Sequence, residues 1–259
     1  MMEITTDDSL TRKNVAVLVA AQAVLGSQMP MIFVIGGLAG GMLTGNPCLA
    51  TLPISLVVFG SMTTAPWLSA LMQKRGRKAG FFIGAIGGAL GALVSAYGLY
   101  LSSFSLLLFG SYLSGIYMSA QGFYRFAATD NASKEFRPKA IAYITAGGLI
   151  YAVLGPQLNK FVQDASVIPF LGTYVTVAGL NLIGMFLFLL LKFPQNTSSK
   201  GLKNNMQPPR EYGALLRDPR ILVSVVCGMV AYSLMNLVMT STPLAVVGCG
   251  FTKNNANDV

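Results

Sequence analysis

The sequence has very little charge for its length. Only 10% of its 259 residues are charged, whereas a soluble domain carries about 25%. Hydrophobic residues make up 53% of the chain. A helix that crosses a bilayer needs about 20 consecutive apolar residues, so this composition excludes a water-soluble globular domain. The long stretches without any charge lie between Lys13 and Lys74, between Lys78 and Arg125, and between Arg220 and Lys253.

Histidine is absent and cysteine is rare, which removes the usual metal-binding and catalytic sets. Cys48, Cys227 and Cys249 have no Cys-x-x-Cys or metal-ligand spacing. We predict that they are free thiols; the alternative is a pair between Cys48 and Cys249, if both lie outside. No metal and no cofactor is expected. A membrane enzyme is the weakest function class, because the apolar stretches contain no paired carboxylates.

The apolar stretches divide into seven predicted transmembrane helices, so the expected fold class is an all-α membrane protein. Pro138 and Pro219 lie at the start of two of them, where the missing N–H of proline costs nothing. A cleaved signal peptide is excluded at the N-terminus, because the first apolar run is too long and further spans follow. The predicted spans cover residues 14–37, 49–72, 79–101, 103–124, 138–158, 168–191 and 221–247.

Lysine and arginine predict the orientation of these helices. Positively charged loops stay on the cytoplasmic side, and a cytoplasmic N-terminus leaves only Lys160 and Lys253, of 18 basic residues, on the outer side. We therefore expect a multi-pass protein of the plasma membrane, of the bacterial inner-membrane type, surrounded by the lipid bilayer. The net charge of +9 does not indicate nucleic-acid binding, because the basic residues are confined to connectors.

The connector over residues 192–220 differs from the others in length and composition. It is rich in proline, serine, asparagine and glycine, which is typical of an interdomain linker. Six predicted helices precede it and one follows it. The sequence thus predicts a six-helix transmembrane bundle over residues 1–191, a cytoplasmic linker over 192–220, and the first helix of an incomplete second bundle over 221–259.

The connector between the second and third predicted helices carries a motif. Residues 69–78 read Ser-Ala-Leu-Met-Gln-Lys-Arg-Gly-Arg-Lys. This segment resembles the signature loop of the major facilitator superfamily, Gly-x-x-x-Asp-(Arg/Lys)-x-Gly-(Arg/Lys)-(Arg/Lys), which lies between the same two helices. Ser69 and Gln73 replace the glycine and the aspartate of that pattern. The matching positions are Lys74, Gly76, Arg77 and Lys78.

The resemblance implies a transporter fold made of two six-helix halves, about twelve helices in all. The chain ends after the seventh predicted helix, so we expect a truncated product whose missing partner is the C-terminal half of the same protein. In the family this loop belongs to an inner gate, where Gln73 cannot supply the negative charge of the usual aspartate. The predicted cytoplasmic gate comprises Gln73, Lys74, Gly76, Arg77, Lys78, Arg125 and Asp130.

Polar side chains inside the predicted helices are the candidates for binding a substrate, because burying them in lipid is costly. The resemblance implies a substrate site between the halves, lined mainly by the first, fourth and seventh helices. In the fourth helix a polar stripe with helical spacing runs from Ser111 to Arg125. The alternative is that such groups bridge neighbouring helices. The predicted substrate-binding residues are Gln22, Gln28, Ser114, Tyr117, Gln121 and Asn236.

These features favour secondary transport of a small organic solute by alternating access. No Asp, Glu or His lies inside a predicted helix, so a proton relay through this part of the protein is not expected. The alternative function is a seven-helix membrane receptor or sensor, which would signal as an intact seven-helix chain. Transport by residues 1–259 alone is not expected, because alternating access needs a second bundle.

Overall fold

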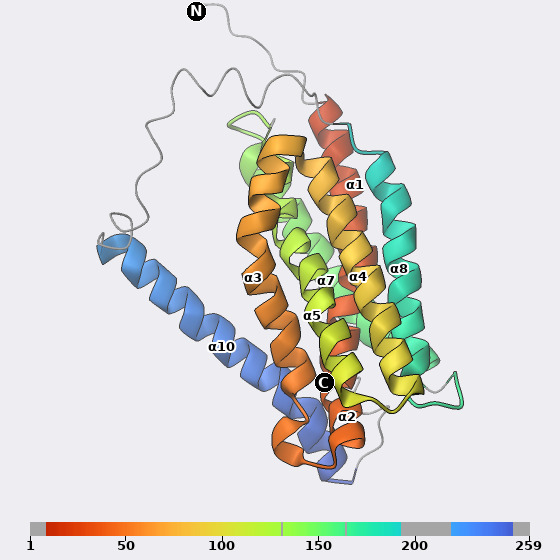
Figure 1. Ribbon diagram of the computed structural model, residues 1–259. Helices are drawn as coiled ribbons and strands as arrows, with labels where there is room; N and C mark the ends of the chain where they lie inside the picture. Colours follow the sequence, from red (N-terminus) through yellow and green to blue (C-terminus); the bar gives the residue numbers. More distant parts are fainter. Residues whose placement is uncertain (1–8, 131, 164, 193–218, 251–259) are drawn as a thin grey trace, which may run out of the picture.

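The computed structural model describes residues 9–130, 132–163, 165–192 and 219–250, and this part of the chain is almost entirely helical, without a strand (Figure 1). The predicted all-α fold is confirmed. Most of the helices lie side by side along the long axis of the bundle. The elements are α1 (Ser9–Gly26), α2 (Gln28–Thr44), η1 (Pro47–Leu49), α3 (Leu52–Arg75), α4 (Arg77–Tyr100), α5 (Phe104–Gly122), α6 (Tyr124–Thr129), α7 (Arg137–Val162), α8 (Leu171–Leu189) and α10 (Pro219–Gly248).

Six helical stretches are long and apolar enough to cross a membrane, namely the α1–α2 pair, α3, α4, α7, α8 and α10. Each corresponds to one predicted span. The ends differ by one to four residues, except in the first span, which was predicted over 14–37 and extends over Ser9–Thr44. The predicted fourth span is also helical, as α5 followed by α6, but α5 is not one of the six. Its four serines and Gln121 lower its hydropathy. Most of its side chains are nevertheless apolar, and it packs against both α3 and α4.

The helical hydrogen bonds of the first membrane span are interrupted near Ser27, which itself keeps a helical backbone with φ −58° and ψ −22°. We refer to this interruption as the break. Helices α1 and α2 together cover Ser9–Thr44, 36 residues in all. Pro30 has no N–H to donate to the carbonyl of Gly26, four residues earlier, and its ring crowds that carbonyl. The hydroxyl of Ser27 donates to the carbonyl oxygen of Val24 at 2.5 Å. The break thus places backbone groups and polar side chains inside the bundle.

Small residues let the helices approach closely. Helix α4 packs between α5 and α8, α3 packs against α5, and α1 packs against α7. A Cβ built at Gly84 would collide with Ala120, and one built at Gly60 would collide with the backbone oxygen of Tyr112. The large side chains that fill the interior include Phe81, Tyr117, Tyr124 and Phe188.

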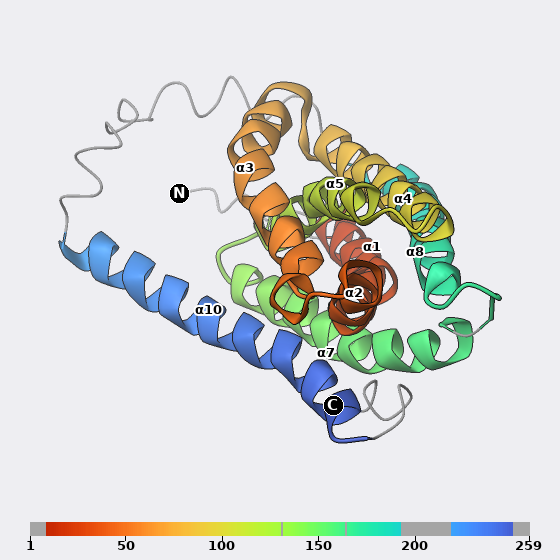
Figure 2. The ribbon, with the colours of Figure 1, turned by 60° about the horizontal axis from the view of Figure 1, so that its bottom comes forward.

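Helix α10 lies outside the bundle along most of its length (Figure 2). Near its C-terminal end it packs against α2, where a Cβ built at Gly37 would lie 3.4 Å from Cδ1 of Leu244. Apolar side chains such as Val223, Met229 and Leu237 are exposed, and lipid or further helices would cover them. The predicted linker over 192–220 falls almost wholly on residues 193–218, outside the described residues.

Candidate functional site

Side chains from α5 and α7 meet at the break between α1 and α2. A Cβ built at Gly26 would lie 2.6 Å from Cδ1 of Tyr151 and 3.1 Å from Nε2 of Gln121. A Cβ built at Gly155 of α7 would lie 2.6 Å from the carbonyl oxygen of Ser27. Helix α7 therefore runs directly against the break, where only glycine fits. We refer to the polar residues on and around the break, which are Gln22, Gln28, Tyr117, Gln121 and Tyr151, as the break cluster.

Gln28 forms a buried amide pair with Asn181 of α8. Nδ2 of Asn181 donates to Oε1 of Gln28 at 2.8 Å, and Nε2 of Gln28 lies 3.4 Å from Oδ1 of Asn181. Each amide also donates to a backbone carbonyl of its own span, Gln28 to Leu25 and Asn181 to Val177, both at 2.9 Å. For Gln28 the geometry thus supports the alternative role of bridging two helices.

Several buried polar atoms around the break make no hydrogen bond to the residues that the structure describes. They are Oε1 of Gln22 and the hydroxyls of Tyr117 and Tyr124. The two tyrosine hydroxyls lie close to each other, and that of Tyr117 also lies close to Gln28. Buried polar atoms are nearly always satisfied by protein, water or ligand, so Oε1 of Gln22 has the capacity to accept a hydrogen bond from water or a solute. Gln121 and Tyr151 are half-buried and are the more accessible members. The arrangement offers amides, hydroxyls and aromatic rings without charge.

The structure brings four of the six predicted substrate-binding residues into the break cluster. Ser114 lies elsewhere, because its hydroxyl donates to the carbonyl of Gly110 at 3.1 Å and a Cβ at Gly91 of α4 would lie 2.5 Å from its Oγ. Ser114 therefore faces α4. Asn236 lies on α10, where its Nδ2 donates to the carbonyl of Tyr232 at 2.9 Å.

Sequence reasoning missed Asn181 and Tyr151. Asn181 is the single amide in an otherwise apolar helix, and a lone polar residue at membrane depth is the signal that identifies such positions. Tyr151 gives no comparable signal, because a tyrosine ring is common among apolar residues in a transmembrane helix. In the described part of the chain, no three His, Cys, Asp or Glu side chains come close enough to hold a metal ion.

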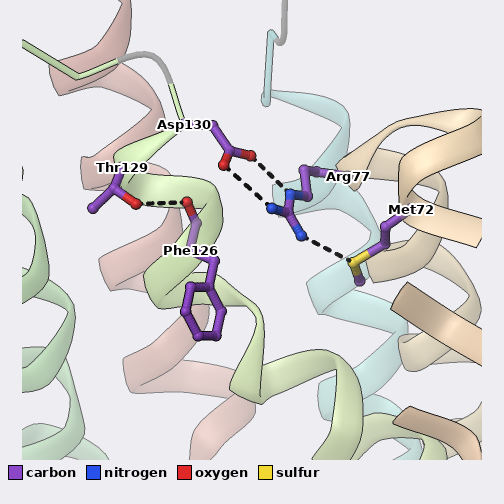
Figure 3. Close-up of polar contacts among 5 residues, drawn as sticks. All are labelled: Met72, Arg77, Phe126, Thr129 and Asp130. Carbon is purple, nitrogen blue, oxygen red and sulfur yellow. Dashed lines mark hydrogen bonds and ion pairs between the residues drawn. The ribbon is translucent and has the colours of Figure 1, made fainter. Parts of the chain in front are cut away.

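The signature loop forms a tight turn between α3 and α4. Gly76 has a φ of +88°, a conformation that favours glycine. The next residue, Arg77, donates from Nε to Oδ2 of Asp130 at 2.7 Å and from Nη2 to Oδ1 at 3.2 Å (Figure 3). Its Nη1 lies 3.9 Å from the sulfur of Met72. Two residues of the predicted gate are thus in direct contact, and they join the start of α4 to the end of α6.

The loop also holds the end of α8. Nζ of Lys78 donates to the carbonyl oxygens of Leu189 at 3.0 Å and Leu191 at 3.3 Å, where a cation complements the helix dipole. Asn14 of α1 also binds the segment after α8. Its Nδ2 donates to the carbonyl of Lys192 at 2.9 Å, and its Oδ1 accepts from the Lys192 N–H at 3.1 Å. The other predicted gate side chains, Gln73, Lys74 and Arg125, are exposed.

Comparison with known proteins decides the family. Residues 17–256 match the sequence pattern of the Major Facilitator Superfamily. The chain belongs to this superfamily. The break cluster and the signature loop are therefore parts of a transporter fold, and the protein is a multi-pass membrane protein. The matches give no support to the receptor alternative.

The relatives of this superfamily chain are transporters. It is 35% identical over 255 residues to the "Riboflavin transporter RfnT" of Brucella anthropi. The alignment covers 97% of this chain and 63% of that protein. It is 26% identical to the uncharacterized MFS-type transporters YddS and YdeG of Bacillus subtilis, over 92% and 91% of this chain and 57% of each relative. The chain thus spans between 57% and 63% of the length of these relatives.

Proposed function

We propose that this chain forms the N-terminal six-helix bundle, and the first helix of the second bundle, of a secondary transporter for a small neutral organic solute. Membership of the Major Facilitator Superfamily supports transport. The observation that carries the proposal is the break cluster, an uncharged set of amides and tyrosines around the discontinuity of the first span. Transmembrane segments interrupted by proline mark substrate sites in many transporters. We place this protein in a plasma membrane, and the distribution of basic residues supports a cytoplasmic N-terminus.

The proposed solute is riboflavin or a related flat heterocycle. The relative that is 35% identical carries the name of a riboflavin transporter. The fused ring of riboflavin presents imide groups that donate and accept hydrogen bonds, and flat faces that stack on aromatic side chains. Gln22 and Gln121 offer amides, and Tyr117 and Tyr151 offer rings and hydroxyls. A few polar groups in a largely apolar pocket suit such a ligand.

The proposed mechanism is alternating access, in which a second bundle rocks against the first around a fixed site. The Arg77–Asp130 pair lies within the first bundle. It therefore stiffens the signature loop of one half, and the exposed Gln73 and Lys74 remain free to meet the other half. The missing C-terminal half of the same protein is the proposed partner.

Riboflavin binding tests the proposed substrate. Flavin fluorescence is quenched when the ring stacks on an aromatic side chain, so titration of the purified chain in lipid nanodiscs yields an affinity. We expect Gln121→Leu to weaken binding about tenfold, the effect of one lost hydrogen bond of about 1.4 kcal/mol. Gln157→Leu is the matched control, because Gln157 is an exposed amide on α7. No binding by the wild-type chain, or equal affinity in Gln121→Leu, contradicts the substrate assignment.

Uptake tests the mechanism separately. Proteoliposomes that contain only residues 1–259 are expected to accumulate no riboflavin above empty vesicles, because one bundle has nothing to rock against. The full-length Brucella relative serves as the positive control in the same vesicles. Robust uptake by residues 1–259 alone would refute the two-bundle mechanism and would leave the binding result intact.

A further inference from the structure

A groove opens between α1 and α7 on the side of the bundle where both helices begin. It encloses about 670 Å³. Arg12 and Lys139 line it at the starts of the two helices, and Val15, Val19 and Ile150 line it further along them. The groove therefore has a cationic mouth and an apolar body.

Neither Arg12 nor Lys139 forms an ion pair with a described residue, and the carboxylate of Glu135, four positions before Lys139, is exposed. The ion pair that the described residues form, Arg77–Asp130, lies elsewhere. The guanidinium of Arg12 lies 5.4 Å from the ring centroid of Phe136 and is held over it by a cation–π contact. The first turn of α7 contains no acidic residue, although a helix N-terminus favours negative charge. An anion bound here would neutralise the positive charges of Arg12 and Lys139 and would interact favourably with the N-terminus of α7.

The expected depths of the cationic mouth and of the apolar body in the membrane suggest what kind of ligand fits the groove. Arg12 precedes the first apolar stretch and Lys139 lies in the first turn of α7, so we expect both side chains to lie where lipid headgroups meet water. Val15, Val19 and Ile150 lie one to three turns further along, at the depth of the acyl chains. A ligand that fills the whole groove carries its negative charge at the interface and hydrocarbon below it.

We propose that this groove binds an anionic phospholipid from the leaflet on the side of the N-terminus, with its phosphate between Arg12 and Lys139 and part of an acyl chain between α1 and α7. Basic pockets between transmembrane helices are typical sites for anionic headgroups. The inner end of the groove adjoins the break cluster, because a Cβ built at Gly147 would lie 3.4 Å from Cβ of Gln22. The proposed phosphate site, at Arg12 and Lys139, lies at the opposite end of the groove. The proposal does not depend on which solute the protein transports.

Lipid retention by the full chain tests the site. The protein is reconstituted in nanodiscs of phosphatidylglycerol and phosphatidylcholine, and native mass spectrometry counts the lipids that stay bound after release. We expect phosphatidylglycerol to be retained and phosphatidylcholine to be lost. The double variant Arg12→Gln/Lys139→Gln should bind phosphatidylglycerol about 30-fold more weakly, from about fivefold for each cation. The control Lys13→Gln/Lys134→Gln removes the same charge from exposed residues outside the lining and should bind like the wild type.

A second pair of variants tests the apolar body of the groove without changing its charge. Ala146→Phe fills the groove and should reduce retention, whereas Ala142→Phe, at an exposed position of α7 outside the lining, should not. Wild-type retention in both Arg12→Gln/Lys139→Gln and Ala146→Phe overturns the proposal. So does equal retention of phosphatidylcholine. Displacement of the bound lipid by millimolar inorganic phosphate would reassign the groove to a soluble anion.

Discussion

Gln28 and Asn181 are 153 positions apart in the sequence and exchange hydrogen bonds inside the bundle. Both side chains are fully buried. In a lipid-embedded protein an unpaired amide is costly, because no water replaces the lost partner. This pair therefore fixes the position of α2 against α8 next to the break. Each side chain keeps one further bond to a backbone carbonyl, which limits the cost of losing its partner.

Removing one amide of the pair should destabilise the protein. We expect Gln28→Leu or Asn181→Leu to cost about 1–3 kcal/mol, because the remaining amide keeps a polar group unpaired. The double variant should recover part of the loss, with a coupling energy of about 0.6 kcal/mol. Unfolding of the purified protein in detergent micelles measures these effects. Gln157→Leu, on the exposed face of α7, is the control and should be near neutral; additive losses in the double variant would show that the amides do not act as a pair.

At the scale of elements, α3 and α5 cross with their backbones almost in contact. A Cβ built at Gly115 of α5 would lie 2.5 Å from the backbone nitrogen of Ser61, and one at Gly60 would collide with the carbonyl oxygen of Tyr112. Close packing of this kind drives association where lipid removes the hydrophobic gain. Helix α5 is thereby held in the bundle between α3 and α4.

Two glycine-to-alanine substitutions should have opposite effects on stability. Gly60→Ala places a methyl group against the backbone of α5, and we expect a loss of about 1–3 kcal/mol from overpacking. Gly179→Ala in α8 meets nothing within 4 Å, so the better helix propensity of alanine should stabilise the protein by about 0.5–1 kcal/mol. Thermal unfolding in one detergent measures both variants. The same sign for both would contradict the close α3–α5 contact.

In the molecule as a whole, the helix ends that carry basic residues lie on the same side of the bundle. Basic residues lie at four helix ends. Arg12 lies at the start of α1, Lys74 at the end of α3, Lys139 at the start of α7 and Lys192 after the end of α8. Figure 1 shows these ends at one side of the bundle, and η1 with Cys48 lies at the other. Such asymmetry sets orientation by holding basic segments in the cytoplasm.

Thiol labelling measures this orientation. Cys48 and Cys249 are exposed free thiols at the predicted outer side, so a membrane-impermeant maleimide should label Cys48 in intact cells. In a cysteine-free background, Lys74→Cys should label only after the cells are permeabilised. Labelling of Lys74→Cys in intact cells, with Cys48 protected, would reverse the topology.

The helices were predicted within a few residues, because each span is set by a long apolar stretch that one-dimensional hydropathy detects. Arg77 and Asp130 were placed in one gate without a prediction of their direct contact, and the pairing of Gln28 with Asn181 was not predicted. The break at Ser27 and the role of Tyr151 were not predicted. These features depend on which faces of distant helices meet, and hydropathy does not record that.

The sequence by itself determined that this protein is embedded in a bilayer, which segments form its membrane-spanning helices, and which connectors carry its basic residues. Lipid imposes those features on each segment separately. Only the tertiary structure decided that Gln121 and Tyr151 meet at Gly26, that Ser114 faces α4, and that Arg12 and Lys139 share one groove. The physical reason is that lipid treats all apolar faces alike, so the choice of neighbours depends on close packing and paired polar groups.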